Sequence, residues 1–202
     1  MILCGLAFVN SPRLGLAQTS ILFGGTINSN ATWTKSNSPY NLTSNVFVSE
    51  GVILTIGPGV VVNCHKFLIQ VNGTLKVLGS DSDKVVFHSD NRIINGAHEQ
   101  LANINFGDDS SDNTIENAIL ETMGFTYYNC NNIITINNNY FKDSTTPTSS
   151  GDISVTSTVR GTGNAIITNN LFTGGIQLAC SASIINNTFN GLMVKIPWKI
   201  IT

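Results

Sequence analysis

The phrase N-N-x-F occurs three times in the second half of the chain, as NNYF at 138–141, NNLF at 169–172 and NNTF at 186–189. Each copy follows a short aliphatic run. The first two copies start 31 residues apart and the last two 17 residues apart. A phrase that recurs at such spacings, with connecting loops of different lengths, indicates a solenoid in which each copy marks the same place in successive coils.

The residue types in this phrase have structural roles in a parallel coil. The aliphatic residues before it point into a narrow core and stack on their equivalents one coil away. An Asn at a corner tolerates a left-handed backbone conformation, and its amide can bond to the Asn of the next coil, which makes a ladder. The Phe then returns to the core and stacks. We therefore assign structural ladder and stack positions, rather than ligand binding, to Asn138, Asn139, Asn169, Asn170, Asn186, Asn187, Phe141, Phe172 and Phe189.

The first half of the chain contains short β-rich segments separated by Gly, Asn and Pro, as at 53–59 and 75–79. Such segments have the strand and turn signals of an all-β protein, and no window of about 12 or more residues shows the apolar period of a helix. An antiparallel β-sandwich is the competing fold, but it would need longer alternating strands and gives the phrase no reason to recur. The sequence therefore predicts an all-β, single-stranded right-handed parallel β-helix with about 20 residues per coil.

Polarity in this chain comes mainly from uncharged side chains. Charged residues make up 11% of the 202 residues, against about 25% in an average globular domain. Asn occurs 26 times, with 16 copies between residues 101 and 190. The net charge of −2 does not provide the clustered Lys and Arg that nucleic-acid binding requires, and the length fits one domain.

The N-terminus has features of a targeting segment. Ile2–Val9 is an apolar run too short to span a bilayer, and Gly15–Ala17 offers small residues at a cleavage position before Gln18. We therefore expect residues 1–17 to be a signal segment and the protein to be secreted or at the cell surface. An apolar first strand or cap is the alternative. No other apolar stretch is long enough to span a membrane.

Residues 18–202 are expected to form the β-helix domain. Its N-terminal cap is placed at about 21–45, and Trp33 within it is interpreted as exposed. The tail 193–202 is apolar and contains no turn after Trp198. Because a solenoid cannot leave an apolar coil open to water, the tail is interpreted as a cap, a docking edge or the cut end of a longer protein.

Four segments of the first half carry a family resemblance: 38–40, 54–60, 71–75 and 85–89. They resemble the first coils of secreted right-handed parallel β-helix proteins of the pectin lyase-like class. The N-N-x-F phrases resemble the generic coils of that class, so the resemblance extends over about residues 30–190. It implies the fold and a secreted protein. These motifs are structural, so no particular activity follows from them.

An enzyme of this class would cleave a polysaccharide, and glycoside hydrolysis requires two carboxyl groups flanking one bond. Gly107-Asp108-Asp109 resembles a catalytic stretch of the polygalacturonase branch, but the companion motifs Asn-Thr-Asp, Gly-His-Gly and Arg-Ile-Lys are missing. A lyase would need cationic groups near an acidic sugar, and the second half of the chain is poor in them. The alternative hypothesis is thus an enzyme with carboxylates on long loops, whose candidate residues are Asp108, Asp109, Asp143, Asp152 and Arg160.

Asp108, Asp109 and Asp112 are also the candidate ligands for a calcium ion. Carboxylate oxygens suit this ion, yet their spacing matches no defined calcium loop. An ice-binding face would need Thr-x-Thr in coil after coil, and the motif, which occurs for example at 32–34 and 156–158, is not repeated in this way.

Transition-metal binding is also disfavoured. His65 and His88 could stack one coil apart, but Cys64 would face the opposite side of its strand and would not converge with them. Cys64, Cys130 and Cys180 are predicted to be small buried hydrophobic residues, because their number is odd and their spacing is wide.

The leading hypothesis from the sequence is a non-catalytic extracellular or cell-surface scaffold or adhesin-like module. Its expected partners are a surface polysaccharide or further domains of the same chain. Neither nucleic acid nor a membrane span is expected.

Overall fold

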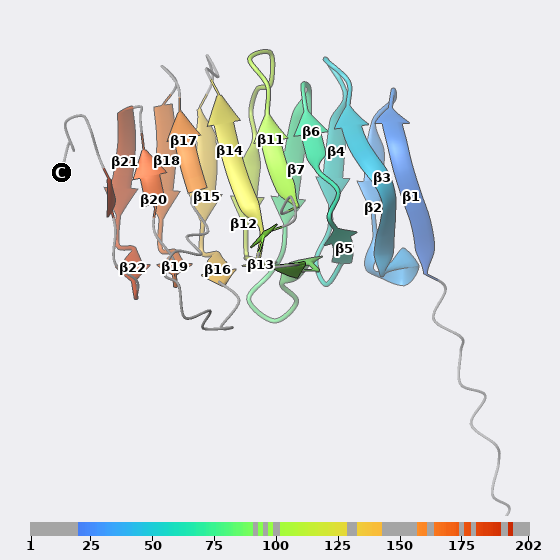
Figure 1. Ribbon diagram of the computed structural model, residues 1–202. Coiled ribbons are helices and arrows are strands. Elements are labelled where there is room, and N and C mark those ends of the chain that lie inside the picture. The colour runs from blue at the N-terminus through green and yellow to red at the C-terminus, as the bar shows by residue number, and fades with distance from the viewer. Residues whose placement is uncertain are drawn as a thin grey trace, which may run out of the picture.

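The computed structural model describes residues 20–90, 93–94, 97–98, 102–128, 133–142, 157–160, 164–173, 176–178, 181–190 and 194–195. Apart from one 3-10 helix, η1 (Lys35–Asn37), the described elements are all strands, and they wind into a parallel β-helix (Figure 1). The predicted fold class is therefore confirmed. No helix among these residues has the length and apolar character needed to cross a membrane. The expected signal segment and most of the tail at 193–202 lie outside the described residues.

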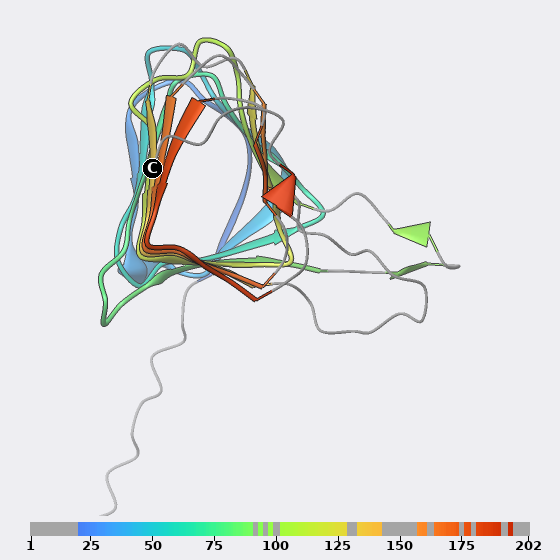
Figure 2. The same ribbon diagram turned by 90° about the vertical axis from the view of Figure 1, so that its left-hand side faces the viewer.

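The strands form three faces, which give the molecule a triangular cross-section (Figure 2). Sheet B is separate, whereas faces A1 and A2 belong to one sheet that bends at β3 (Tyr40–Val48). Neighbouring strands pair in parallel. Sheet B consists of β2 (Ala31–Trp33), β4 (Ile53–Ile56), β7 (Thr74–Leu78), β12 (Thr114–Glu116), β15 (Ile134–Asn137), β18 (Asn164–Thr168) and β21 (Ser181–Ile185).

Faces A1 and A2 begin with β1 (Ile21–Ile27), which pairs along both halves of β3. An antiparallel pair, β9 (Ile93–Ile94) and β10 (Ala97–His98), lies outside the coils. Face A1 continues with β5 (Val61–His65), β8 (Val85–Ser89), β13 (Ala118–Glu121), β16 (Tyr140–Lys142), β19 (Leu171–Phe172) and β22 (Thr188–Phe189). Face A2 continues with β6 (Ile69–Val71), β11 (Asn103–Phe106), β14 (Gly124–Tyr128), β17 (Ser157–Arg160), β20 (Ile176–Leu178) and β23 (Val194–Lys195).

The coils are right-handed. Seen from the C-terminal end, the chain passes along A1, then A2, then sheet B, and turns anticlockwise as it advances toward the viewer (Figure 2). At the corner between sheet B and A1, equivalent residues of successive coils are 21, 31 and 17 positions apart. A basic coil therefore needs about 20 residues, as predicted, and a longer coil contains an inserted loop.

Inward-pointing side chains form columns of stacked apolar residues. In sheet B, one column of successive equivalents is almost inaccessible to solvent, and its members after Trp33 in the first coil are β-branched. Such side chains pack well on a pleated surface, and burying each one stabilises the fold by about 1.5–3 kcal/mol relative to exposure. The β-branched members are Ile56, Val77, Ile115, Ile136 and Ile167.

On face A1 the equivalent column is largely aromatic. Phe141 stacks on Phe172 with ring centroids 4.6 Å apart, and Phe172 stacks on Phe189 at 5.0 Å. Leu120 and Phe87 hold the same place in two earlier coils. The Phe of each N-N-x-F phrase is thus a stacked core residue.

The first Asn of each phrase lies at the corner between sheet B and A1. Asn138, Asn169 and Asn186 have φ of 55°, 57° and 54°, in the left-handed region. The amide Nδ2 of Asn186 donates to Oδ1 of Asn169 at 2.7 Å, and Nδ2 of Asn138 donates to Oδ1 of Asn117 at 2.6 Å. Between these two pairs, Nδ2 of Asn169 donates to Oδ1 of the neighbouring Asn137 at 2.9 Å. The first asparagines therefore form an outer ladder that shifts by one residue at this step, and Asn117, with φ of 53°, extends it by one coil that lacks the full phrase.

The second Asn of each phrase forms an inner ladder. Nδ2 and the backbone N–H of Asn139 donate to Oδ1 of Asn170 at 3.1 and 2.9 Å. The same two groups of Asn170 donate to Oδ1 of Asn187, each at 2.9 Å. Each Nδ2 also donates to a carbonyl oxygen of the preceding coil, namely that of Ile115, Ile136 or Ile167.

The N-terminal end of the core is covered by aromatic side chains. Trp33 stacks on Tyr40 at a centroid distance of 4.6 Å and meets Phe23 edge-on at 5.3 Å. Trp33 is only 3% exposed, so the interpretation of Trp33 as exposed was wrong. The first coil has no coil before it in the described chain, and the wide indole ring of Trp33 covers its apolar end.

The edge strand β1 is interrupted by a bulge between Phe23 and Gly25, a feature that discourages pairing with another chain.

Candidate functional site

Five charged or titratable side chains form a network on the outer surface of face A1. His65 Nδ1 lies 2.5 Å from Asp90 Oδ2, and His88 Nδ1 lies 3.0 Å from Glu121 Oε2. His88 Nε2 is 3.9 Å from Asp90 Oδ1, and Lys142 Nζ donates to Glu121 Oε1 at 2.9 Å. Because an ionised carboxylate only accepts hydrogen bonds, Nδ1 of each histidine is the donor. We call this set the A1 ionic network.

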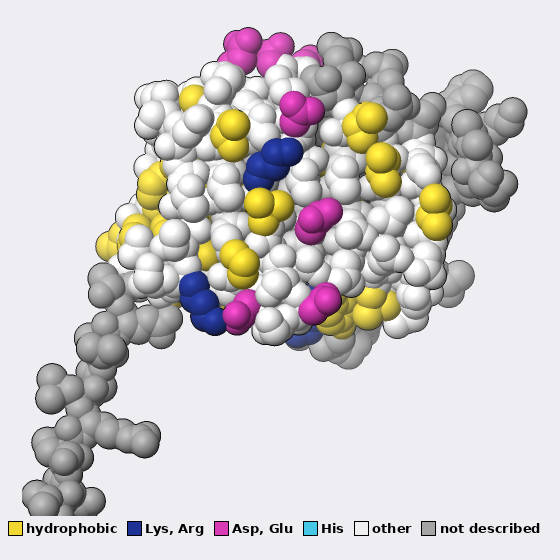
Figure 3. All heavy atoms as spheres, turned by 180° about the vertical axis from the view of Figure 1, so that it is seen from behind, with side chains coloured by type: hydrophobic (Ala, Val, Ile, Leu, Met, Phe, Trp, Pro, Cys, Tyr) yellow, Lys and Arg dark blue, Asp and Glu magenta, His cyan; other side chains and the backbone are white. Residues whose placement is uncertain are grey.

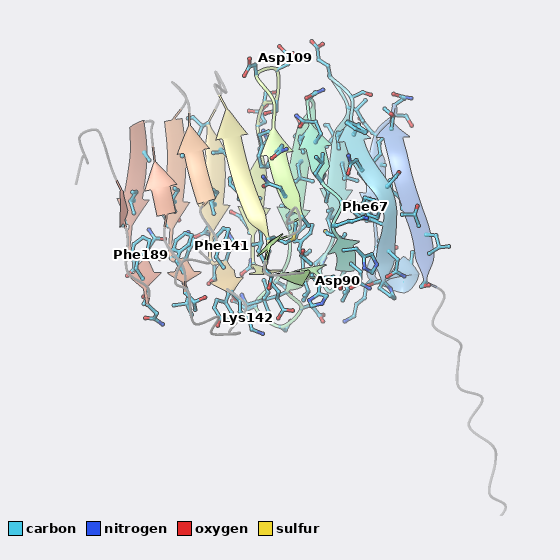
Figure 4. All side chains as sticks on the ribbon, viewed as in Figure 1. Phe67, Asp90, Asp109, Phe141, Lys142 and Phe189 are labelled. Atoms are coloured by element: carbon cyan, nitrogen blue, oxygen red, sulfur yellow. The ribbon has the colours of Figure 1, made fainter. Side chains whose placement is uncertain are left out.

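Strand register brings the network together from four coils. The pairing of β8 with β13 places His88 beside Glu121, and that of β13 with β16 places Glu121 beside Lys142. Asp90 directly follows β8, and Figure 4 shows it at the same edge of the molecule as Lys142. The β9–β10 pair projects from this A1–A2 corner, away from the coils (Figure 2).

The electrostatics of the network keep Glu121 ionised. The hydrogen bond from Lys142 is the main cause that lowers the pKa of Glu121; partial burial opposes it, and the hydrogen bond with His88 adds to it. The pKa of Lys142 is raised, chiefly by its hydrogen bond to Glu121. A general acid in glycoside hydrolysis needs a raised carboxyl pKa. Glu121 in this state accepts hydrogen bonds and does not fit that role.

A second candidate site is a shallow cavity of about 350 Å³ on the outer surface of sheet B. Short threonine side chains lie between two larger isoleucines, which leaves the hollow. Lys76 Nζ crosses it and donates to Thr114 Oγ1 at 3.3 Å and to the carbonyl oxygen of Asp112. The lining residues are Ile53, Thr74, Lys76, Asp112, Asn113, Thr114, Ile133 and Thr135.

The cavity lies on a column of outward residues in register along sheet B. Figure 3 shows this surface of the molecule, where charged side chains are sparse among uncharged polar ones and scattered hydrophobic ones. Four of the positions are threonine, although the motif Thr-x-Thr is not repeated from strand to strand. The column is Thr32, Thr55, Lys76, Thr114, Thr135, Ile166 and Ser183.

The acidic residues singled out from the sequence lie elsewhere. Asp108 and Asp109 are exposed in the turn after β11, and Figure 4 shows Asp109 at the opposite edge of the molecule from Asp90 and Lys142. Asp112 follows in the left-handed region, with φ of 52°, at the rim of the sheet B cavity. The aspartates of this turn are thus not joined to the A1 ionic network. Within the described part of the chain, no group of His, Cys, Asp and Glu is arranged to hold a metal ion.

Cys64 and His65 point to opposite sides of β5. Cys64 is fully buried, and burial raises the pKa of its thiol, which keeps it protonated. His65 is partly exposed and contacts Asp90. The two histidines therefore meet around a carboxylate and not around a thiol.

Several residues singled out from the sequence lie outside the part of the chain that the structure describes. Asp143, Asp152, Cys130 and Cys180 are not among the described residues. For Arg160, only its place at the end of β17 is described.

The sequence predicted neither candidate site as a set, because their members are unevenly spaced; it indicated only that His65 and His88 lie one coil apart. In the A1 ionic network, 25, 33 and 21 residues separate His65 from Asp90, His88 from Glu121, and Glu121 from Lys142. In the sheet B column, 38 residues separate Lys76 from Thr114. Aligning each strand on its buried residues would have revealed these columns, since the buried positions repeat in every coil.

Comparisons with known proteins return no relatives of this chain. No protein-family model matches it, no curated protein is similar to it, and no solved structure matches its fold closely. The observations support a parallel β-helix with asparagine ladders and aromatic stacks, at the level of fold alone.

Proposed function

We propose that this protein is a non-catalytic extracellular or cell-surface β-helix scaffold that contacts a polysaccharide with the outer surface of sheet B. The observation that supports the proposal is the column of outward side chains in register, most of them short and hydroxyl-bearing. The strands of a sheet are about 4.8 Å apart, so such a column offers hydrogen-bonding groups at regular intervals. An extended polymer of hydroxylated units is a partner of matching shape and chemistry.

The charge of this surface favours an uncharged polymer. Lys76 is the one cation in the column, and Glu116 lies on the adjacent strand β12. A polyanion would be expected to require a surface richer in positive charge. The resemblance of the early coils to secreted pectin lyase-like proteins agrees with a location outside the cell, where such polymers occur.

Affinity electrophoresis and pull-down assays test this proposal. The protein is run through gels containing soluble glucans, mannans, galactans or polygalacturonate, and is incubated with insoluble cellulose and chitin. We expect at least one neutral polymer to retard or retain it. A Thr135→Lys variant should lose this retention because it places a bulky charge on the column, whereas Thr188→Lys on face A1 should keep it. No retention by any polymer would refute the proposal.

A carbohydrate-active enzyme is the second candidate, and the A1 ionic network favours it. Asp90, His88, Glu121 and Lys142 combine carboxylates with groups that can transfer protons near the corner from which the β9–β10 pair projects. Incubation with the same polymers, followed by assays for unsaturated and reducing ends, decides this point. Product release that disappears in Glu121→Gln would establish an enzyme. Product release lost instead in Asp108→Ala and Asp109→Ala would place the site at the turn after β11.

A further inference from the structure

We infer that the sheet B cavity is a binding site for a short neutral saccharide segment, held between Ile53 and Ile133 by Lys76, Asp112, Thr114 and Thr135. This inference rests on the proposed function and assigns it to one place on the sheet. The cavity volume of about 350 Å³ is at the lower end of the range of about 300–1,000 Å³ for ligand sites. It therefore suits one or two sugar rings of a longer chain.

The two ends of the cavity are apolar. Ile53 is 39% exposed and Ile133 is 50% exposed. A sugar ring has an apolar face of C–H groups, which gains free energy when it leaves water against methyl groups. The isoleucines thus provide contact surface for the ring faces.

The polar groups between them match hydroxyls. The ammonium of Lys76 has three donors; one is directed to the carbonyl of Asp112 and one to Thr114 Oγ1, which leaves one for a ligand. The carboxylate of Asp112 accepts only, whereas the hydroxyls of Thr114 and Thr135 can both donate and accept. A pair of sugar hydroxyls can accept from Lys76 and donate to Asp112 at the same time.

The charges of the lining select against acidic sugars. Lys76 and Asp112 are its charged members, and their charges cancel. A uronate carboxylate that approached Lys76 would also approach Asp112, and like charges repel. A neutral sugar meets no such penalty.

The floor of the cavity is already ordered. The buried side chain of Asn113 accepts from the N–H of Leu75 at 2.8 Å and donates to Ser110 Oγ at 3.2 Å. Its backbone carbonyl accepts from the N–H of Thr135 at 3.0 Å. Three neighbouring strands are thereby fixed relative to one another, so binding requires little ordering of the backbone.

Titration of the whole chain with defined oligosaccharides tests the inference. Gluco-, manno-, galacto- and chito-oligosaccharides and oligogalacturonates are tested one at a time, by calorimetry and by ligand-observed saturation-transfer NMR. We expect a neutral oligosaccharide to bind, and Lys76→Met to weaken it at least tenfold. The matched variant Lys66→Met, at an exposed lysine after β5, should bind within twofold of wild type.

A second variant keeps the inference testable if Lys76→Met fails to fold. Asp112→Asn preserves the size of the side chain and a residue that tolerates positive φ, but it removes the carboxylate. It should bind oligogalacturonates at least tenfold more tightly than wild type does. Oligogalacturonates that already bind wild type as well as neutral sugars would overturn the inference.

Failure of this inference and failure of the proposed function give different experimental results. If a polysaccharide retains both wild type and Lys76→Met equally, the sheet B cavity is not the site, although the proposed function stands. If no polysaccharide retains wild type, the proposed function fails whatever the oligosaccharides do.

Discussion

Asn170 shows, at the scale of a single residue, how an apolar core of this shape accepts polar side chains. It is 2% exposed, yet its Nδ2 donates to Ile136 and Asn187 and its Oδ1 accepts twice from Asn139. A buried amide without partners would cost several kcal/mol. Here the coil above and the coil below supply them, so the residue links three coils.

Replacing Asn170 should destabilise the folded protein. Asn170→Ala leaves the N–H of Asn139 and the carbonyl of Ile136 buried without their partner, and we expect the free energy of unfolding to fall by about 2–4 kcal/mol. Asn190→Ala removes an exposed Asn of the next coil and should change it by less than about 0.5 kcal/mol. Urea denaturation of both variants checks this. Equal effects would contradict the inner ladder.

The outer ladder can be separated into conformation and hydrogen bonding. Asn138 has φ of 55°, a region that costs an ordinary residue about 1–2 kcal/mol. Asn138→Ala loses the tolerance for this conformation together with the hydrogen bonds to Asn117 and Asp81, whereas Asn138→Gly loses only the two hydrogen bonds. We expect Ala to be more destabilising than Gly by about 1 kcal/mol. A glycine variant no more stable than the alanine one would show that backbone conformation does not matter here.

At the scale of elements, the stacking of strands places the recurring N-N-x-F phrases in register, so that their Phe side chains form one continuous stack. Phe172 on β19 lies between Phe141 on β16 and Phe189 on β22. Because each strand extends the sheet formed by the one before it, an aromatic side chain at the same place in each coil always meets its equivalent. The recurrence of the phrase made this stack predictable from the sequence.

Core position should set the cost of removing each ring. Phe172→Ala should lower the free energy of unfolding by about 3–5 kcal/mol, whereas Phe189→Ala should cost less because Phe189 is only partly buried. Phe172→Leu should cost less than half as much as Phe172→Ala, since Leu120 already holds an equivalent place. Chemical denaturation midpoints rank the three variants. A Phe189→Ala variant as unstable as Phe172→Ala would contradict the stack.

The A1 ionic network connects β5, β8, β13 and β16 and should make stability depend on pH. The pKa of Glu121 in the folded state is lowered from its ordinary value of 4.5, mainly by Lys142. Its stabilising contribution is therefore fully present above pH 4.5 and is lost as pH falls through the lower, folded-state pKa. Between about pH 5 and pH 3, wild type should lose more stability than Glu121→Gln, in which this group cannot titrate.

Denaturation midpoints of the two proteins across that pH range measure the difference, because the other carboxylates are common to both. Lys142→Met removes the other partner of this contact. Its stability should therefore also fall less than that of wild type as the pH is lowered. Parallel curves for all three proteins would show that the contact between Glu121 and Lys142 does not stabilise the fold.

At the scale of the whole molecule, the interior could be predicted from the sequence and the exterior could not. Inward positions such as Ile136 and Phe141 are restricted by packing in every coil, so their pattern repeats and can be recognised. Outward positions such as Thr114 and His88 are under no such restriction, and the loops between coils hide their register. Trp33 was misjudged for a related reason: its neighbours in sequence are polar, and only the end of the solenoid explains its burial.

The N-N-x-F phrase therefore specifies the architecture, whereas we place the function on the outer surface of sheet B. Hydroxyl-radical footprinting with and without a retained polysaccharide tests this separation most directly, because it reports which exposed side chains the ligand covers. We predict that Ile53 and Ile133 lose reactivity when the polymer is bound, while Tyr140 and Leu171 on face A1 keep theirs. Protection of Tyr140 and Leu171 with Ile53 and Ile133 unchanged would contradict the account and place the contact beside the A1 ionic network.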